Sequence, residues 1–184
     1  MMEITFVTSN DNKFREAERI LKEFGVNIRH AKLSYPEIRS DDPADIAADS
    51  VERLKGKVEP PFFVEDTGLF IDALNGFPGT YTAWVLKKIG IGGILRLMEG
   101  VTQRRAAFRT AIAFFDGKGL HVFKGEAKGS ISTQARGREG FGYDPIFVPD
   151  GFQKTFAELS VVEKDAVSHR RMALEELVKH LAKG

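Results

Sequence analysis

The stretch PFFVEDTGL, residues 61–69, places two adjacent carboxylates directly after a short, wholly apolar run. Phe62, Phe63 and Val64 show no polar alternation, which is typical of a central strand covered on both faces of its sheet. Such a strand requires a layered fold, because each face must be packed against other elements. Glu65 and Asp66 then lie at the end of a buried element, where carboxylates cost desolvation energy unless something compensates them.

Along the rest of the chain, predicted β-strands alternate with predicted α-helices, and the middle of the chain is rich in strands. Residue patterns predict strands at 3–8, 26–32, 62–65, 105–115 and 120–128, and helices at 13–24, after Asp42-Pro43, at 81–88, at 92–98 and from Ser160 onward. Asp42-Pro43 is typical of an N-cap followed by Pro at the first helical position, and Ser160 with Glu163 has the spacing of a capping box. We therefore expect one α/β unit with a mixed sheet and a cleft where strand ends meet loops.

Composition excludes several classes of function. The 184 residues suit a single domain over 1–184, and the absence of cysteine excludes disulfides, thiolate nucleophiles and cysteine-based zinc sites. The formal net charge of +1 gives no support to nucleic-acid binding. We find no signal-peptide pattern and no apolar run long enough to span a membrane, so we expect a soluble, cytoplasmic protein without nucleic-acid or membrane partners.

The segment TSNDNK, residues 8–13, joins the first predicted strand to the first predicted helix. Such a junction exposes backbone N–H groups and suits an anion, and Thr8, Ser9 and Asn10 add short polar side chains. Lys13 opposes the helix dipole at a cost of about 0.3–1 kcal/mol, which an incoming phosphate would justify. An ordinary polar cap with a solvated lysine is the alternative.

The acidic residues allow two readings as well. Glu37, in the loop segment YPEIRS, is by itself an ordinary surface residue. Glu65 and Asp66 point to opposite faces if the strand stays extended, so only one of them can face a given cleft. Alternatively, Asp66 forms an Asx-turn, and Thr67-Gly68 turns the chain away from the strand.

Two C-terminal segments carry candidate binding groups. The loop GREGFGYDPIF, residues 137–147, combines glycines with Phe141 and Tyr143, which offer stacking faces for a base unless they are core residues of a packed corner. The segment EKDAVSHRR, residues 163–171, supplies donors for a carbonyl or phosphate oxygen, or else forms a solvated basic face.

Seven segments in this order, TSNxxK, YPEI, EDTGL, NGFPGTY, GFGYDPIF, TFAEL and EKxxxSHR, resemble the inosine triphosphate pyrophosphatase family. That family hydrolyses non-standard purine nucleoside triphosphates such as ITP, dITP and XTP. The resemblance implies an elongated mixed sheet flanked by helices, in two lobes with a central active-site cleft, the segment of about 75–130 forming much of the second lobe. It also implies a homodimer, Mg²⁺ (with Mn²⁺ as a substitute), and cleavage to a nucleoside monophosphate and pyrophosphate.

The family pattern also implies roles for individual positions. The phosphate-binding loop falls on Thr8, Ser9, Asn10, Asp11, Asn12 and Lys13, although Asn12 stands where glycine is common. The metal carboxylates fall on Glu37, Asp66 and Glu65, with Asp66 as the general base and Thr67 touching substrate. The residues flanking the base are Phe141, Gly142, Tyr143 and Asp144. The residues that contact the polar edge of the base are Lys164, His169 and Arg170. Ser168 holds the backbone turn between them.

Charge explains why a cation belongs in such a site. A carboxylate about 5 Å from a phosphate charge is opposed by roughly 3 kcal/mol at an effective dielectric near 20. Mg²⁺ takes oxygen ligands and bridges phosphates, so it would compensate Asp66 and Glu37. The alternatives are a nucleotide-binding module or sensor without turnover, and an RNA-binding protein, which the net charge disfavours.

Overall fold

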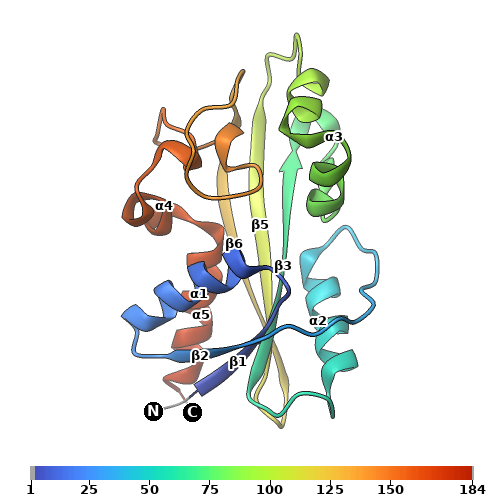
Figure 1. Ribbon diagram of the computed structural model, residues 1–184, viewed down its shortest axis with the longest axis vertical. Coiled ribbons are helices and arrows are strands. Elements are labelled where there is room, and N and C mark those ends of the chain that lie inside the picture. Colours follow the sequence, from blue (N-terminus) through green and yellow to red (C-terminus); the bar gives the residue numbers. More distant parts are fainter. Residues whose placement is uncertain (1–2, 184) are drawn as a thin grey trace. The chain divides into compact units, whose positions relative to one another are not determined.

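A mixed sheet of seven strands organises the chain, which the computed structural model describes over residues 3–183 (Figure 1). The strands are β1 (Glu3–Val7), β2 (Asn27–Ala31), β3 (Phe62–Ile71), β4 (Pro78–Gly79), β5 (Arg105–Phe115), β6 (Leu120–Ile131) and β7 (Phe147–Pro149). Their order is β2-β1-β3-β5-β6-β7, with β4 paired to β3. β1 runs parallel to β2 and β3, whereas β4 and β7 are antiparallel to their partners, so the predicted mixed α/β fold is confirmed.

Five α-helices accompany the described part of the sheet. They are α1 (Asp11–Glu23), α2 (Pro43–Leu54), α3 (Thr82–Leu97), α4 (Val161–Val167) and α5 (His169–Leu181). No described helix is both long enough and apolar enough to cross a membrane.

The chain divides into two compact units. Of the described residues, the first contains 3–66, 110–125 and 170–183, and the second contains 67–109 and 126–169. The division falls within β3, β5 and β6. Residues 110–125, which lie inside the middle segment expected for the second lobe, belong to the first unit because Ile112 and Phe114 pack in its core.

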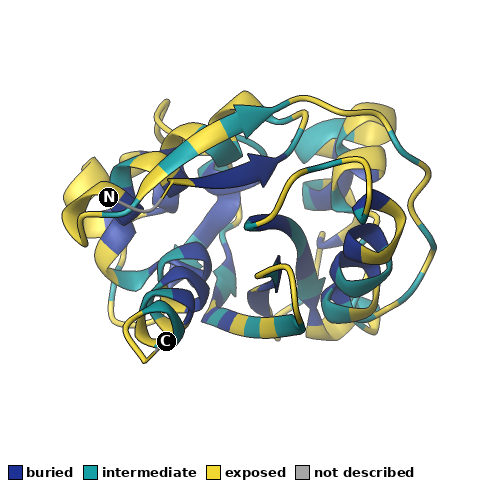
Figure 2. Cartoon of the chain, turned by 90° about the horizontal axis from the view of Figure 1, so that it is seen from below, coloured by how far each residue is buried: buried dark blue, intermediate teal, exposed yellow. Residues whose placement is uncertain are grey.

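The first unit encloses two apolar clusters around β3, as the sequence predicts. Phe62, Phe63 and Val64 are all buried, with exposed fractions of 0%, 0% and 1%. Phe63 packs with buried residues of α1 and α5, whereas Phe62 and Val64 pack with those of α2. The buried stripe of α5 is visible in Figure 2. Both faces of this strand are therefore covered, which leaves no room for alternating polar residues.

Local capping sets the helix boundaries where the sequence predicts them. The Asn10 side chain accepts hydrogen bonds at the start of α1, and Asp42 caps α2 with Pro43 at the first helical position. Ser160 and Glu163 form a reciprocal capping box on α4. Such caps satisfy backbone donors that the helix itself leaves without partners.

The predicted turn at Thr67-Gly68 is wrong, because β3 stays extended through both residues. The adjacent pair Leu69 and Gly79 aligns β3 with β4. A Cβ atom on Gly68 would lie 2.6 Å from the carbonyl oxygen of Gly79. Glycine is required here by the close approach of β4, a contact that the local sequence does not reveal.

Two predicted helices differ in continuity from the structure. The segments expected at 81–88 and 92–98 are joined in α3, which is kinked where Gly90 has φ 64° and ψ −174°. The C-terminal helix is instead divided at Ser168, whose φ of −80° and ψ of 140° are extended. That break coincides with the passage of the chain from the second unit into the first.

We expect Gly68→Ala to lower the free energy of unfolding by about 1–3 kcal/mol, because the added methyl overpacks the β3–β4 contact. The matched control is Gly92→Ala in α3, where the new methyl meets nothing within 4 Å. Alanine there should be neutral or stabilising by up to about 1 kcal/mol. Denaturant unfolding of both variants checks this, and equal stabilities would contradict the close-approach explanation.

Candidate active site

The carboxylate of Glu65 is committed to an internal ion pair. Its side chain has an exposed fraction of 0%, and that of Arg170 is 2%. Arg170 donates from Nε to Oε2 at 2.7 Å and from Nη2 to Oε1 at 2.8 Å. Both oxygens of Glu65 are therefore engaged by one guanidinium. The role of Glu65 as a metal ligand stays a prediction.

Glu16 and Lys13 complete this buried cluster. Nη1 of Arg170 donates to Oε2 of Glu16, and Nζ of Lys13 lies 3.4 Å from Oε1 of Glu65. Burial lowers the pKa of Arg170, but the charges of Glu65 and Glu16 outweigh it and raise that pKa above its ordinary value. Two cations balance two carboxylates, which is the condition for holding such charges inside a protein.

This arrangement shows what holds two of the predicted site residues. Arg170 is buried in the first unit between Glu65 and Glu16, and its role in reading a base stays a prediction. Lys13 does not need an incoming phosphate to justify its place in the first turn of α1, since Glu65 already balances it. The sequence analysis missed Glu16; its position beside Ala17 on the buried face of α1 was the available indication.

The start of α1 combines capping with exposed polar groups. The Thr8 hydroxyl accepts from the Asn10 N–H at 3.1 Å, and the Asn10 side chain accepts from the N–H groups of Asn12 and Lys13. The capping alternative is therefore realised at Thr8 and Asn10. The remaining members of the predicted phosphate loop, Ser9, Asp11 and Asn12, are exposed.

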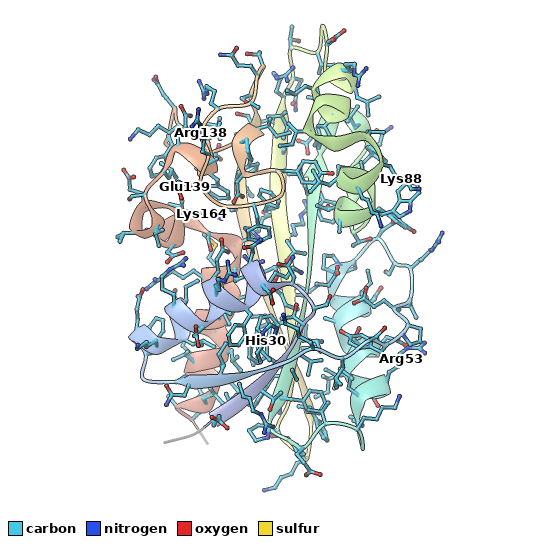
Figure 3. The ribbon with its side chains drawn as sticks, viewed as in Figure 1. His30, Arg53, Lys88, Arg138, Glu139 and Lys164 are labelled. Atoms are coloured by element: carbon cyan, nitrogen blue, oxygen red, sulfur yellow. The ribbon has the colours of Figure 1, made fainter. Side chains whose placement is uncertain are left out.

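Two side chains of the segment after α1, His30 and Lys32, contact this loop. His30 approaches the Thr8 carbonyl oxygen at 2.8 Å through Nε2 and stacks on the Phe14 ring at 4.1 Å (Figure 3). Lys32 pairs with Asp11 at 2.6 Å, and its hydrogen bond lowers the pKa of that carboxylate. The contact of His30 with the Thr8 carbonyl thus holds the start of the loop, while Ser9, Asp11 and Asn12 are exposed to solvent.

Glu37 and Asp66 act on the same tyrosine. Burial raises the pKa of Tyr35 to about 12, with the charges of Glu37 and Asp66 adding to this and a hydrogen bond with Ser50 opposing it. Thr110 donates to the backbone carbonyl of Asp66 at 2.9 Å, which ties this end of β3 to β5. The side chains around Asp66 thus offer carboxylate and hydroxyl oxygens, a donor set that fits Mg²⁺.

The two adjacent acids therefore have different surroundings, as strand alternation predicts. Glu65 packs among cations from α1 and α5. Asp66 is half-buried and influences Tyr35, which packs against the apolar cluster of α2. Thr67 follows on the same strand, half-buried, as the first residue of the second unit.

The second unit holds a separate cluster around Lys164. Its Nζ lies 2.6 Å from Oδ2 of Asp144, which also accepts from the N–H of Phe141 at 2.9 Å (Figure 3). The same ammonium lies 5.3 Å from the centroid of the Phe141 ring. Three predicted substrate-binding residues are thus brought together, as a donor, an acceptor and an aromatic face.

Other predicted residues of this unit are more deeply packed. Tyr143 is 1% exposed and donates to the carbonyl of Thr82 at 2.9 Å, as the packed-corner alternative predicts. Its place beside a base stays a prediction. Burial raises the pKa of its hydroxyl to about 12. His169 is 5% exposed and stacks on Phe108 with a centroid distance of 4.8 Å.

Two smaller residues shape the path of the chain here. Ser168 is 1% exposed and separates α4 from α5. Gly142 has a φ of 64°, a conformation that glycine adopts without strain, and it lies between Phe141 and Tyr143. Both are therefore positioned to orient neighbouring side chains.

We expect Arg170→Met to cost about 3–5 kcal/mol of folding free energy, because it leaves two carboxylates buried without their common cation. The adjacent Arg171→Met is the control. Arg171 pairs with Glu23 and Glu175 nearer the surface, so its loss should cost less than about 1 kcal/mol. Thermal and denaturant unfolding compare the two, and similar losses would refute the role given to Arg170.

Known proteins resemble this chain over nearly all its length. The model of the Ham1 family matches residues 4–180. The dITP/XTP pyrophosphatase of Thermococcus kodakarensis is 47% identical over 180 residues, covering 98% of this chain and 97% of that protein. The dITP/XTP pyrophosphatase of Pyrococcus horikoshii is 49% identical over 181 residues, with coverages of 98% and 97%.

Solved structures agree with this result. The structure of a HAM1 protein from Coxiella burnetii superposes with a TM-score of 0.84 at 30% identity, covering 100% of both chains. The nucleoside-triphosphatase / dITP/XTP pyrophosphatase of Mycobacterium abscessus gives a TM-score of 0.75 at 33% identity, covering 98% of this chain and 100% of that one. The resemblance found in the sequence motifs is confirmed, and the chain belongs to the Ham1 family.

Proposed function

We propose that this chain hydrolyses non-standard purine nucleoside triphosphates, dITP, ITP and XTP, to the nucleoside monophosphate and pyrophosphate. The observation that carries the proposal is that the two adjacent acids, Glu65 and Asp66, have different surroundings. Glu65 is neutralised inside the protein, whereas Asp66 shares its surroundings with Glu37 and Tyr35. The near full-length similarity to dITP/XTP pyrophosphatases supports the choice of substrate.

In this proposal Glu37 and Asp66 hold a divalent cation, Mg²⁺ or its substitute Mn²⁺. When bound, such a cation neutralises phosphate charge and favours the formation of a nucleophilic hydroxide from water. Asp66 orients the attacking water and takes its proton as a general base. Tyr35, whose raised pKa keeps the phenol neutral at physiological pH, can donate a hydrogen bond beside the two carboxylates.

The triphosphate itself is received by the first turn of α1. The exposed Ser9 and Asn12 supply polar groups, and the positive end of the helix favours an anion. The side chain of Lys13 is 18% exposed, so it can reach a phosphate oxygen while remaining close to Glu65. These groups position the phosphates, and Asp66 acts on the attacking water.

The cluster around Lys164 is suited to a 6-oxopurine. Such a base presents an acceptor at O6 and a donor at N1, which matches an ammonium beside a carboxylate; adenine presents the reverse pattern. Lys164 donates, Asp144 accepts and Phe141 offers a ring face. A mismatched base leaves buried polar groups without partners, and this discriminates strongly.

The main alternative is a nucleotide-binding protein without turnover. Pure binding requires no base, so the presence of Asp66 and Glu37, whose charges both act on Tyr35, favours an enzyme. A homodimer and a cytoplasmic location are part of the proposal, and sedimentation of the purified chain tests the first of these.

We expect dITP, ITP and XTP to be hydrolysed in Mg²⁺ at least tenfold more efficiently than ATP, with pyrophosphate and the monophosphate as products. Chromatography of the nucleotide together with a pyrophosphate assay measures both products. Excess chelator should abolish turnover, and added Mg²⁺ or Mn²⁺ should restore it. Release of inorganic phosphate instead would contradict the proposed cleavage position, and tight binding without turnover would favour the alternative.

We expect Asp66→Asn to reduce kcat by roughly 10²–10⁴, because it removes the general base, while the unfolding temperature changes little. Asp49→Asn is a suitable control, since this acid of the same unit pairs only with the nearby Arg53 in the contacts described. Glu37→Gln should raise the Mg²⁺ concentration needed for half-maximal activity. Near-normal turnover of folded Asp66→Asn would refute its assignment.

A further inference from the structure

A second group of metal-ligating side chains lies in the first unit, and the proposed hydrolysis does not use it. Asp116 and His121 flank the turn between β5 and β6, and His180 is in the last turn of α5. One ligand atom from each residue lies within 4.8 Å of those of the other two. Figure 1 shows the β5–β6 turn and the C-terminal end of α5 at the same end of the drawing.

The turn holds the carboxylate of Asp116 in a defined orientation. Its Oδ1 accepts hydrogen bonds from the N–H groups of Lys118 and Gly119, both at 2.7 Å. The hydrogen bond from Gly119 and, to a smaller extent, the one from Lys118 lower the pKa of Asp116 to about 2, so the carboxylate is ionised. Oδ2 is left to face His121. Hydrogen bonds of this kind to the second oxygen are typical of carboxylates that serve as metal ligands.

The distance between Asp116 and His121 matches two ligands of a single cation. Oδ2 of Asp116 and Nε2 of His121 are 3.3 Å apart. Tetrahedral Zn²⁺ with nitrogen and oxygen ligands at about 2.0–2.2 Å places neighbouring ligand atoms roughly 3.3–3.5 Å apart. Without a metal, the two atoms form a long hydrogen bond at this distance. A shared cation could therefore enter with little movement of either side chain.

Aromatic packing places the second imidazole beside the first. The ring centroids of His121 and His180 are 4.2 Å apart, with planes inclined at 42°. The ring centroids of Phe114 and Phe123 lie 6.1 Å and 5.5 Å from that of His180. Both histidines are half-buried, so a small rotation of the His180 side chain can bring its nitrogen closer to the other two ligands.

We propose that Asp116, His121 and His180 bind a divalent transition-metal cation, with Zn²⁺ as the best match, which ties the end of α5 to the β5–β6 turn. Two imidazoles and one carboxylate suit Zn²⁺, whereas Mg²⁺ and Ca²⁺ prefer oxygen ligands. Since Asp116 is exposed, water can occupy the remaining coordination position.

This site is separate from the candidate active site. Thr110, whose hydroxyl contacts the backbone of Asp66, lies on β5 six residues before Asp116. A strand rises about 3.3 Å per residue, so the two places are roughly 20 Å apart along β5. A cation bound here acts on the stability of the first unit and takes no part in phosphate chemistry.

Zinc binding to the purified protein tests the proposal, with ion already present removed by a chelator. Calorimetric titration compares the wild type with two double variants, Glu37→Gln/Asp66→Asn and His121→Gln/His180→Gln. We expect the acidic double variant to keep one equivalent of Zn²⁺ and the histidine double variant to lose it. At a hundredfold excess over Kd, Zn²⁺ should raise the unfolding temperature by roughly 5–10 °C only where the histidines are present.

Two further variants make the result decisive. Asp116→Asn keeps an acceptor for the turn but removes the charge, so it should weaken Zn²⁺ binding at least tenfold without disturbing the fold. His30→Gln removes a histidine of the same unit outside the cluster and should leave Zn²⁺ binding unchanged. The histidine double variant should also retain the Mg²⁺-dependent activity. Equal Zn²⁺ affinity in wild type, Asp116→Asn and His121→Gln/His180→Gln would overturn the proposal, as would absence of Zn²⁺ binding by Glu37→Gln/Asp66→Asn.

Discussion

The buried guanidinium of Arg170 joins three segments that are far apart in the sequence. It contacts Glu65 on β3 and Glu16 on α1, which precede it by 105 and 154 residues, and it lies near the start of α5. Removing one member of such a group leaves a charge uncompensated, so the geometry is strongly specified. A shift of β3 by one residue would exchange Glu65 with Asp66 and turn the wrong acid toward Arg170. The ion pair thus fixes the register of the strand that carries the candidate general base.

This constraint extends to the groups around the site. With Glu65 facing α1 and α5, strand alternation places Asp66 in the surroundings that include Tyr35 and Glu37. Lys13 adds a second contact between α1 and β3 through the Glu65 carbonyl at 3.3 Å, so the start of α1 is held beside the end of the buried strand segment. The position of the candidate phosphate-binding loop, residues 8–13, relative to the acids therefore follows from the same buried charges.

Local patterns predicted the features whose causes are local. The unbroken apolar run at Phe62–Val64 indicated a strand covered on both faces, and Ser160 with Glu163 indicated a capping box. Gly68 was misinterpreted as part of a turn, because the backbone that requires it belongs to Gly79 on another strand. The ion pairs of Arg170 could not be predicted for a similar reason: the arginine follows Ser168 and His169 in sequence, but its partners lie on β3 and α1.

In the candidate site, too, features with local causes could be predicted and those that depend on distant segments could not. Glu65 and Asp66 could be selected from the sequence because adjacent carboxylates at the end of an apolar run are unusual. Glu37 and Lys164 received their roles only from the resemblance to a family. Which charge neutralises which depends on side-chain packing, so the sequence could not show that Glu65, and not Asp66, pairs with Arg170, or that Tyr143 is buried. Glu16 stayed hidden because a single glutamate in an amphipathic helix is common, and only the position of Arg170 gives it a function.

Two adjacent carboxylates can be stabilised in more than one way, and the choice has consequences for function. If both were neutralised by fixed internal cations, neither would be available to hold an exchangeable metal ion. If both depended on that metal, the protein without it would keep two like charges at the end of a buried strand, at a cost in stability. Here Glu65 has a permanent internal cation, so the fold does not depend on the ligand. Asp66, next to it, lies outside this ion pair, and in the proposed function its charge acts on an exchangeable cation and on a water molecule. The ion pair that stabilises the first unit therefore also limits the cost of a second carboxylate at the neighbouring position.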